Sequence, residues 1–184
     1  MIVYLHGFNS SPQSRKAQLL RRYMAERGLE REFICPALPP SPRDAVRLIE
    51  NAMGEEPPCY VGSSLGGFYA TYLVETQGGK AVLINPAIEP HVGLSADLGP
   101  QKNLYTGESY ELTSSHLAQW RELYVPRVTP QRYLLLVETG DEVLDYRRAV
   151  ERYAGAAQRV IAGGDHSLRS FPEHLAEILR FAGY

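Results

Sequence analysis

The sequence predicts an α/β fold built on a mostly parallel, six-stranded sheet with helices on both faces. Short β-branched or aliphatic runs alternate with longer helical patterns along most of the chain, which is typical of βαβ units. Each short run is almost uniformly apolar, as expected for strands that helices cover on both sides. The chain has 184 residues, of which 44% are apolar, so we expect a single domain over residues 1–184 with an ordinary core.

Six short apolar runs are the expected strands. In chain order they are Ile2–Leu5, Glu32–Cys35, Tyr60–Val61, Ala81–Asn85, Tyr133–Glu138 and Arg159–Ala162.

Five expected helices alternate with these strands, and each has a start signal. Serine followed by proline opens the first two, because serine caps a helix N-terminus and proline fits the first helical position. Glycine, which is common just after a helix, ends the first three. The expected helices begin at Ser11-Pro12, at Ser41-Pro42, directly after Ser64, after the cap Asp145, and at the capping-box pattern Ser170-Phe171-Pro172-Glu173; the first three end at Gly28, Gly54 and Gly78-Gly79.

One segment, at about 87–131, is too long to be an ordinary loop between two strands, since such loops have a median of about 4 to 6 residues. We expect a lid-like insertion here, either with some structure of its own or partly mobile. Leu117, Trp120, Leu123 and Tyr124 lie at helical spacing, which predicts one amphipathic helix inside it.

The composition argues against several classes of partner. A formal charge of −2 without any block of like charges gives no electrostatic basis for binding nucleic acid or an anionic membrane surface. No apolar run approaches the roughly 20 residues of a membrane span, and the start of the chain lacks the basic flank of a signal peptide. Cys35 and Cys59 are expected at opposite edges of the sheet, hence as two thiols. We therefore expect a cytoplasmic protein.

The most informative motif is Gly62-Ser63-Ser64-Leu65-Gly66, which lies between an expected strand and an expected helix. This is the G-x-S-x-G pattern of a nucleophile on a sharp strand-to-helix turn, where side chains two residues before and after the nucleophile would collide. Glycine at both places avoids the collision and exposes the Ser64 hydroxyl. The alternative interpretation is a Gly/Ser-rich turn with no catalytic role, but the expected strand before it and the expected helix after it match the context of a nucleophile turn.

A serine nucleophile needs a base, and His166 is the candidate. It follows the last expected strand within Gly163-Gly164-Asp165-His166-Ser167, at the strand end where catalytic groups gather in parallel sheets. The alternative interpretation of His166 is a loop histidine with no catalytic role that hydrogen-bonds only to the backbone. Of the other histidines, His174 is expected as a solvated residue of the last helix, and His91 and His116 lie in the insertion.

The third member must be a carboxylate that accepts a hydrogen bond from the imidazole. Asp141 lies just past the strand Tyr133–Glu138 and is our candidate. Asp145 is the main alternative, although it is better explained as the N-cap of the next helix. The oxyanion is expected to bind the backbone N–H groups of Phe8, in the loop after the first strand, and of Leu65. His6 is expected to shape that loop through a hydrogen bond.

Four blocks, in the same order, carry a family resemblance: His6-Gly7-Phe8-Asn9-Ser10-Ser11, Gly62-Ser63-Ser64-Leu65-Gly66-Gly67-Phe68, Thr139-Gly140-Asp141-Glu142-Val143-Leu144-Asp145-Tyr146 and Gly163-Gly164-Asp165-His166-Ser167. With these blocks the chain resembles the small bacterial YqiA-like esterases of the α/β-hydrolase superfamily over essentially its whole length. The resemblance implies a compact α/β-hydrolase fold, esterase or acyl-thioester hydrolase activity, and Ser64, Asp141 and His166 as the catalytic triad.

The expected function is therefore a serine hydrolase that cleaves carboxylic esters or acyl thioesters and needs no metal or organic cofactor. The expected partner is a small acyl ester or thioester, while the oligomeric state stays open. Two alternatives remain: a serine hydrolase acting on amides or lactones, and a binding protein with a hydrolase fold but no turnover. A nucleotide-binding domain is disfavoured, because Gly62–Gly67 does not match G-x-G-x-x-G and no phosphate-loop lysine motif occurs.

The sequence says little about substrate binding. Aromatic residues could line an acyl pocket or simply belong to the core, and basic residues of the insertion could meet a phosphate or simply be solvated. The aromatic candidates are Phe8, Phe68, Tyr69, Tyr105, Trp120 and Tyr124, and the basic candidates are Lys102, Arg121 and Arg127.

Overall fold

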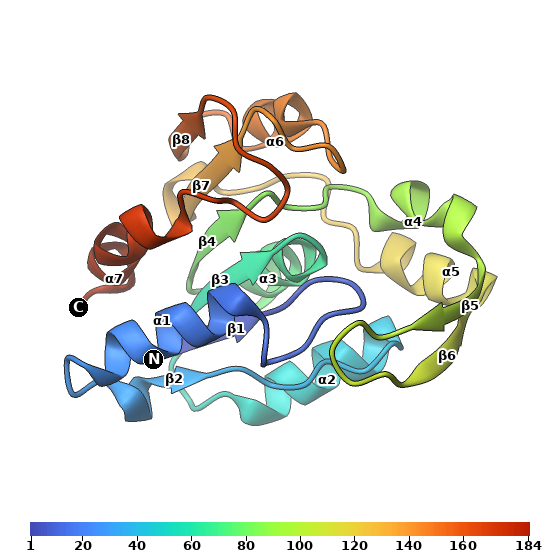
Figure 1. Ribbon diagram of the computed structural model, residues 1–184, viewed down its shortest axis with the longest axis horizontal. Helices are drawn as coiled ribbons and strands as arrows, with labels where there is room; N and C mark the ends of the chain where they lie inside the picture. The colour runs from blue at the N-terminus through green and yellow to red at the C-terminus, as the bar shows by residue number, and fades with distance from the viewer.

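The computed structural model describes residues 1–184, and a six-stranded, wholly parallel sheet lies at its centre (Figure 1). The strand order is β2-β1-β3-β4-β7-β8, which confirms the predicted fold class. The strands are β1 (Ile2–Leu5), β2 (Phe33–Ile34), β3 (Cys59–Ser63), β4 (Lys80–Ile84), β7 (Tyr133–Glu138) and β8 (Ala157–Ile161).

All six predicted strands are present, and only some of their ends differ. Strand β2 is shorter than predicted because Glu30–Glu32 forms a 3₁₀ turn in front of it. Strand β8 begins at Ala157, two residues before the expected start, because it pairs with β7 from Leu134 onward. Both cysteines are free thiols.

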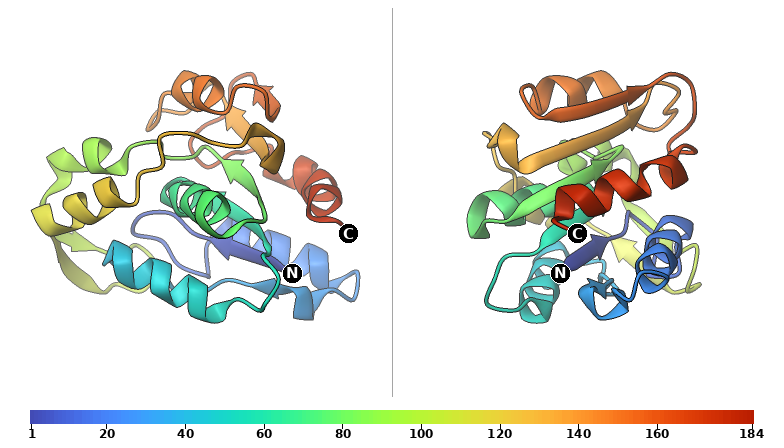
Figure 2. Two further views of the ribbon diagram at one scale, coloured as in Figure 1. Left: turned by 180° about the vertical axis from the view of Figure 1, so that it is seen from behind. Right: turned by 90° about the vertical axis from the view of Figure 1, so that its left-hand side faces the viewer.

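Helices cover both faces of the sheet, with α1 and α7 on one side and α2, α3 and α6 on the other (Figure 2). Their bounds are α1 (Arg15–Ala25), α2 (Pro42–Ala52), α3 (Leu65–Gln77), α6 (Tyr146–Arg152) and α7 (Leu175–Ala182). Alternate strand residues therefore enter two separate cores: Val3 and Leu5 join the cluster under α2 and α3, and Ile2 and Tyr4 join the one under α1 and α7.

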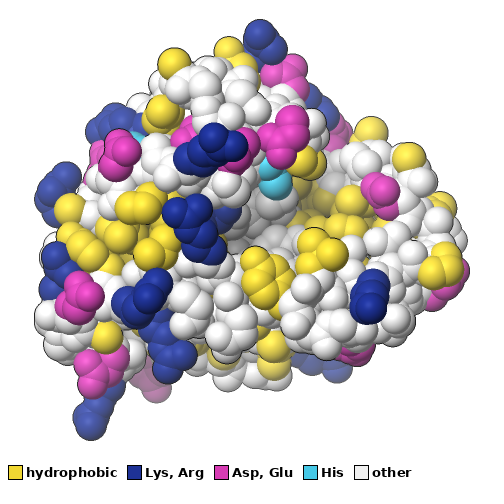
Figure 3. Space-filling view, viewed as in Figure 1, with side chains coloured by type: hydrophobic (Ala, Val, Ile, Leu, Met, Phe, Trp, Pro, Cys, Tyr) yellow, Lys and Arg dark blue, Asp and Glu magenta, His cyan; other side chains and the backbone are white.

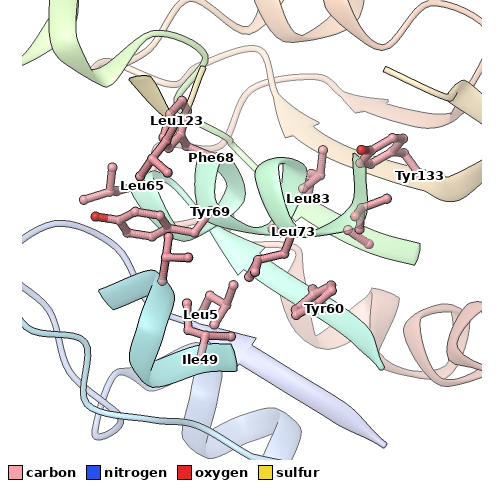
Figure 4. Packing of buried hydrophobic residues seen from close by; sticks show 14 of the residues in the cluster. Leu5, Ile49, Tyr60, Leu65, Phe68, Tyr69, Leu73, Leu83, Leu123 and Tyr133 are labelled. Atoms are coloured by element: carbon pink, nitrogen blue, oxygen red, sulfur yellow. The ribbon is translucent and has the colours of Figure 1, made fainter. Parts of the chain in front are cut away.

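Helix α3 is the central element of the larger core, and its residues from Leu65 to Val74 are all buried except the half-buried Tyr72. Figure 4 shows its residues Leu65, Phe68, Tyr69 and Leu73 among side chains of the sheet and of α2. A helix enclosed in this way is held rigidly by its surroundings. The turn at its N-terminus is therefore fixed relative to the sheet.

Two predicted helix starts are wrong, and both for the same reason. Ser11 and Pro12 form a turn in which Ser11 Oγ accepts a hydrogen bond from Gln13 N, and helix α1 begins only at Arg15. The capping-box pattern at Ser170 is a 3₁₀ turn (Phe171–His174), and the Ser170 hydroxyl bonds Glu138 instead of its own helix. Capping residues also stabilise turns, so the local signal does not separate the two.

The segment 87–131 has structure throughout much of its length. It contains α4 (Pro90–Gly93), the antiparallel pair β5 (Gly99–Lys102) and β6 (Ser109–Leu112), helix α5 (Ser114–Glu122), and 3₁₀ turns at Ser95–Asp97 and Pro130–Arg132. Helix α5 confirms the predicted amphipathic helix, and its buried Trp120 donates a hydrogen bond to the Tyr69 hydroxyl at 2.9 Å.

The β5–β6 hairpin lies against the loop that follows β1. Tyr110 donates a hydrogen bond to Asn9 Oδ1 at 2.7 Å, and Asn103 donates one to the Ser10 carbonyl at 2.9 Å. The Leu104 N–H also bonds the Asn9 carbonyl at 3.0 Å. The segment thus supports the loop that carries Phe8. None of the helices has the length and apolar character needed to cross a bilayer.

Candidate active site

Ser64 lies on a strained turn between β3 and α3. Its φ of +54° and ψ of −119° form a combination that a residue with a side chain rarely adopts. A Cβ at Gly62 would collide with the Gly66 carbonyl, and a Cβ at Gly66 would collide with the Leu5 carbonyl. Glycine is therefore sterically required on both sides of the serine, as the motif predicts.

His166 connects Ser64 to Asp141. Its Nε2 lies 3.1 Å from Ser64 Oγ, and its Nδ1 lies 2.8 Å from Asp141 Oδ2. These side chains come from three loops at the carboxyl ends of β3, β7 and β8, which the parallel sheet brings to one edge. The histidine can therefore exchange a proton with the serine while the carboxylate holds its ring.

The Asp141 side chain is only 1% exposed, yet it is held ionised. Burial alone would raise its pKa, but hydrogen bonds from His166 and from the N–H groups of Leu144 and Val143 outweigh that effect and leave the pKa below its ordinary value. Asp145 is the N-cap of α6 and accepts a hydrogen bond from Arg147 N at 3.0 Å. Of the two candidates, Asp141 is thus the one that contacts the histidine.

The two expected oxyanion donors flank the serine. Leu65 is the first residue of α3, where N–H groups have no acceptor within the helix. The N–H of Phe8 has no acceptor in the protein. A Cβ at Gly7 would approach Ser64 Cβ to 3.2 Å, so the loop lies directly beside the serine. His6 lies at the start of this loop, where its Nδ1 contacts the Gly7 carbonyl at 3.1 Å. Its Nε2 accepts a hydrogen bond from Leu38 N at 3.0 Å, which connects the loop to the segment after β2.

Two cavities meet at Ser64 and His166. One, of about 410 Å³, is lined by the start of α1, by the β5–β6 hairpin and by the His166 loop. The other, of about 350 Å³, is lined by residues near α4 and by Val143 and Leu144. Figure 3 shows a hollow beside a histidine, with Lys or Arg side chains on one side and hydrophobic side chains on the other.

The comparisons with known proteins agree with this architecture. The model of Uncharacterised protein family UPF0227 matches residues 1–183. The chain belongs to this family. The match confirms the YqiA-like family inferred from the four motif blocks.

Solved structures with similar folds cover nearly the whole chain. A protein from Agrobacterium vitis S4 has a TM-score of 0.75 at 18% identity, covering 98% of this chain and 87% of that one. Alpha/beta hydrolase domain-containing protein 10 from mouse has a TM-score of 0.71 at 17% identity, covering 97% and 87%. The esterase domain of a Rhodothermus marinus protein has a TM-score of 0.63 at 16% identity, covering 97% and 83%. These likenesses show that this UPF0227 member has the α/β-hydrolase fold.

Two residues that sequence reasoning missed organise the His166 loop. Glu138, 1% exposed at the end of β7, accepts hydrogen bonds from the N–H groups of Asp165, Arg169 and Ser170 and from the Ser170 hydroxyl. Asn85, just after β4, donates to the carbonyls of Asp165 and His166 and accepts from Glu138 N. The one signal in the sequence was that Glu138 and Asn85 come at the ends of strands. Their hydrogen-bond partners in the His166 loop lie too far along the chain to be predicted from a local pattern.

The expected substrate-binding residues divide between the cavity walls and the core. Phe8 and Tyr105 line cavities beside Ser64, whereas Phe68 and Trp120 are buried in the core. None of Lys102, Arg121 and Arg127 lines either cavity; the basic residues that do are Arg15, Lys16 and Arg148. The expectation that His174 is a solvated residue of the last helix is wrong: it is the last residue of the 3₁₀ turn before α7, and its Nε2 is buried.

Proposed function

We propose that this UPF0227 member is a serine hydrolase that cleaves small carboxylic esters or acyl thioesters through an acyl-enzyme on Ser64. The observation that carries the proposal is the continuous hydrogen-bonded series from Asp141 through His166 to Ser64, on a strained turn open to two cavities. A Gly/Ser turn without chemistry does not account for a buried carboxylate aligned on the histidine. The reaction class agrees with that of the Rhodothermus marinus esterase domain, which has the same fold.

In the first half-reaction Ser64 Oγ attacks the carbonyl carbon of the substrate while His166 Nε2 takes the hydroxyl proton. The negative charge that develops on the carbonyl oxygen is stabilised by the N–H groups of Phe8 and Leu65. As the tetrahedral intermediate collapses, the bond to the alcohol or thiol breaks, and His166 returns the proton to that leaving group.

In the second half-reaction water attacks the acyl-enzyme, and His166 accepts a proton from it. The second tetrahedral intermediate releases the carboxylic acid, and the proton goes back to Ser64. Asp141 stays ionised throughout, which matches its low pKa, and stabilises the imidazolium each time that it forms. The reaction needs no group beyond the side chains and backbone described.

The experiment that tests this proposal is labelling with a fluorophosphonate probe, combined with hydrolysis of 4-nitrophenyl butyrate. We expect stoichiometric label on Ser64, found by peptide mass spectrometry, and its loss in Ser64→Ala and His166→Ala. Both substitutions should lower kcat on the order of 10⁴-fold or more. Ser109→Ala, an exposed serine on β6, is the matched control and should react like the wild type.

Folded protein that neither takes up the label nor cleaves the ester would contradict the proposal and favour a binding protein with a hydrolase fold. If the label reaches Ser64 but only amides or lactones are cleaved, the nucleophile is right and the substrate class is wrong. A panel of butyryl esters, thioesters and amides separates these outcomes.

A further inference from the structure

One of the two cavities at Ser64 has a basic wall that the proposed reaction does not use. The wall is the first turn of α1, where Arg15 and Lys16 line the cavity opposite the β5–β6 hairpin. Neither residue forms an ion pair with a carboxylate. Two cations that form no ion pair therefore line the cavity beside the nucleophile.

The Lys16 side chain is held by one hydrogen bond and still has N–H groups free to bind a ligand. Its Nζ donates one hydrogen bond to the Ser167 carbonyl at 2.8 Å, so an ammonium with three N–H groups keeps two for a ligand. Burial lowers the pKa of Lys16 to about 8, although the negative charges of Asp165 and Glu138 act to raise it. The side chain is therefore still mainly protonated at pH 7. An anion next to it would replace the hydration that burial removes.

The N-terminus of α1 adds a second attraction for negative charge. Ser14 occupies the capping position but makes no capping hydrogen bond, and its buried Oγ has no partner in the protein. The N–H groups of Arg15 and Lys16 have no acceptor, and the first turn contains no acidic residue. These groups leave the positive end of the helix dipole uncompensated.

The acidic groups near this wall are already engaged. Glu142 is the carboxylate that lines the cavity, and it accepts a hydrogen bond from His166 N at 3.0 Å. Asp165 pairs with Arg169 at 2.6 Å, and Glu138 is surrounded by its four donors. The two cations therefore outnumber the one carboxylate that lines the cavity.

The cavity also follows the loop of His166, the residue that protonates the leaving group. His166 lines both cavities, but the next two residues, Ser167 and Leu168, line only this one. The other cavity is lined by apolar residues such as Ile88 and Leu94 and also by Glu89, Asp97, Asp145 and Arg148. Its carboxylates outnumber its one arginine, so an anionic group is favoured in the first cavity and an uncharged acyl chain in this one. Figure 3 shows basic side chains on one side of the hollow, hydrophobic side chains on the other, and acidic side chains near the histidine at its rim.

We propose that Lys16 and Arg15, with the N-terminus of α1, form an anion-binding subsite for the leaving group, so that preferred substrates are esters or thioesters whose alcohol or thiol part bears a carboxylate or phosphate. This inference rests on the proposed function and deepens it. Lys16 acts here as a specificity-determining residue and takes no part in the transfer of the acyl group.

The test is a pair of esters that differ only in charge: 4-butyryloxy-3-nitrobenzoate and its primary amide, 4-butyryloxy-3-nitrobenzamide. Both have the same acyl group and release a nitrophenolate. A charge-assisted hydrogen bond is stronger than one between neutral groups, so we expect the wild type to prefer the carboxylate by about tenfold or more in kcat/KM. Lys16→Gln should remove most of this preference, and Arg15→Gln a smaller part.

The ratio between the two esters protects the test from indirect effects. Lys16→Gln also removes the hydrogen bond to the Ser167 carbonyl, which can disturb His166, but such a disturbance slows both esters alike and leaves the ratio unchanged. Arg22→Gln, an exposed arginine on the same helix outside the cavity, is the matched control for the loss of one charge and should keep the wild-type ratio.

Competition against the neutral ester distinguishes the two anions. Benzoate and phenyl phosphate should each inhibit the wild type more strongly than Lys16→Gln, and the stronger inhibitor shows which anion the subsite prefers. Equal kcat/KM for the two esters in the wild type, or an unchanged ratio in Lys16→Gln, would overturn the subsite while leaving the esterase intact. If neither ester is cleaved and Ser64 is not labelled, the proposed function itself fails.

Discussion

At the scale of single residues, the site depends on how each loop presents one polar side chain. Ser64 lies on a strained turn that places it at two cavities. Asp141 is aligned because two backbone N–H groups hold the same carboxylate that contacts His166. The motifs were sufficient to predict these three residues as candidates. They were not sufficient to choose between Asp141 and Asp145, since both follow the same strand.

Substitution of the two aspartates tests that choice directly. Asp141→Asn should lower kcat about 10⁴-fold, because an amide stabilises the wrong histidine tautomer and cannot compensate the imidazolium. Asp145→Asn should leave kcat within a few-fold, since asparagine also caps a helix. Steady-state hydrolysis of 4-nitrophenyl butyrate measures both. Retained activity in Asp141→Asn together with a large loss in Asp145→Asn would reverse the assignment.

At the scale of elements, the turn between β3 and α3 is determined by packing on both sides. Gly66 approaches the Leu5 carbonyl of β1 so closely that no other residue fits, and α3 is enclosed by the larger core. The strand-to-helix turn was therefore predictable from sequence. The starts of α1 and α7 were not, because serine and proline stabilise a turn as well as a helix N-terminus.

The steric requirement at Gly66 predicts a large difference between two glycine substitutions. Gly66→Ala should destabilise the protein by more than about 3 kcal/mol or prevent folding, because its Cβ would overlap backbone that cannot move. Gly54→Ala is the control, since a Cβ there meets nothing within 4 Å, and it should change stability by less than about 1 kcal/mol. Urea unfolding followed by circular dichroism measures both; equal stability in the two variants would contradict the steric argument.

At the scale of the whole molecule, the loops that follow several parallel strands lie at one edge of the sheet. Buried carboxylates connect these loops through hydrogen bonds. Glu138 connects the end of β7 to the loop after β8 through four hydrogen bonds. Burial alone would raise its pKa, but these hydrogen bonds outweigh burial, and the pKa lies below its ordinary value. Hydrogen bonds likewise outweigh burial and lower the pKa values of Asp141 and of Glu75, a residue of α3 that accepts hydrogen bonds from Thr129 and from the Tyr133 hydroxyl.

These lowered pKa values predict a loss of stability in acid. A carboxyl group whose pKa is lower in the folded than in the unfolded protein stabilises the fold above its unfolded pKa of about 4.3, and this stabilisation disappears as the pH falls through the folded pKa. The free energy of unfolding should therefore decrease below about pH 5. Glu138→Gln should be less stable at pH 7 by about 1 to 3 kcal/mol, because its amide would face N–H donors, and its stability should depend less on pH.

Urea unfolding at pH 7, 5 and 4 measures this effect. Glu56→Gln, a substitution of an exposed glutamate, is the matched control and should follow the wild type at each pH. A Glu138→Gln variant with the same pH dependence as the wild type would show that this carboxyl does not contribute to acid unfolding.

Local patterns in the chain were enough to predict the alternation of strands and helices, the nucleophile turn and the types of residue around it, because steric and periodic patterns act between close neighbours. The contact between His166 and one particular carboxylate, the support of its loop by Glu138 and Asn85, and the cations that line the cavity depend on the folded structure. Lys16 and Ser167 are 151 positions apart, yet they share a hydrogen bond. Such contacts depend on the order of strands in the sheet and on the loops at its edge, which no local pattern encodes.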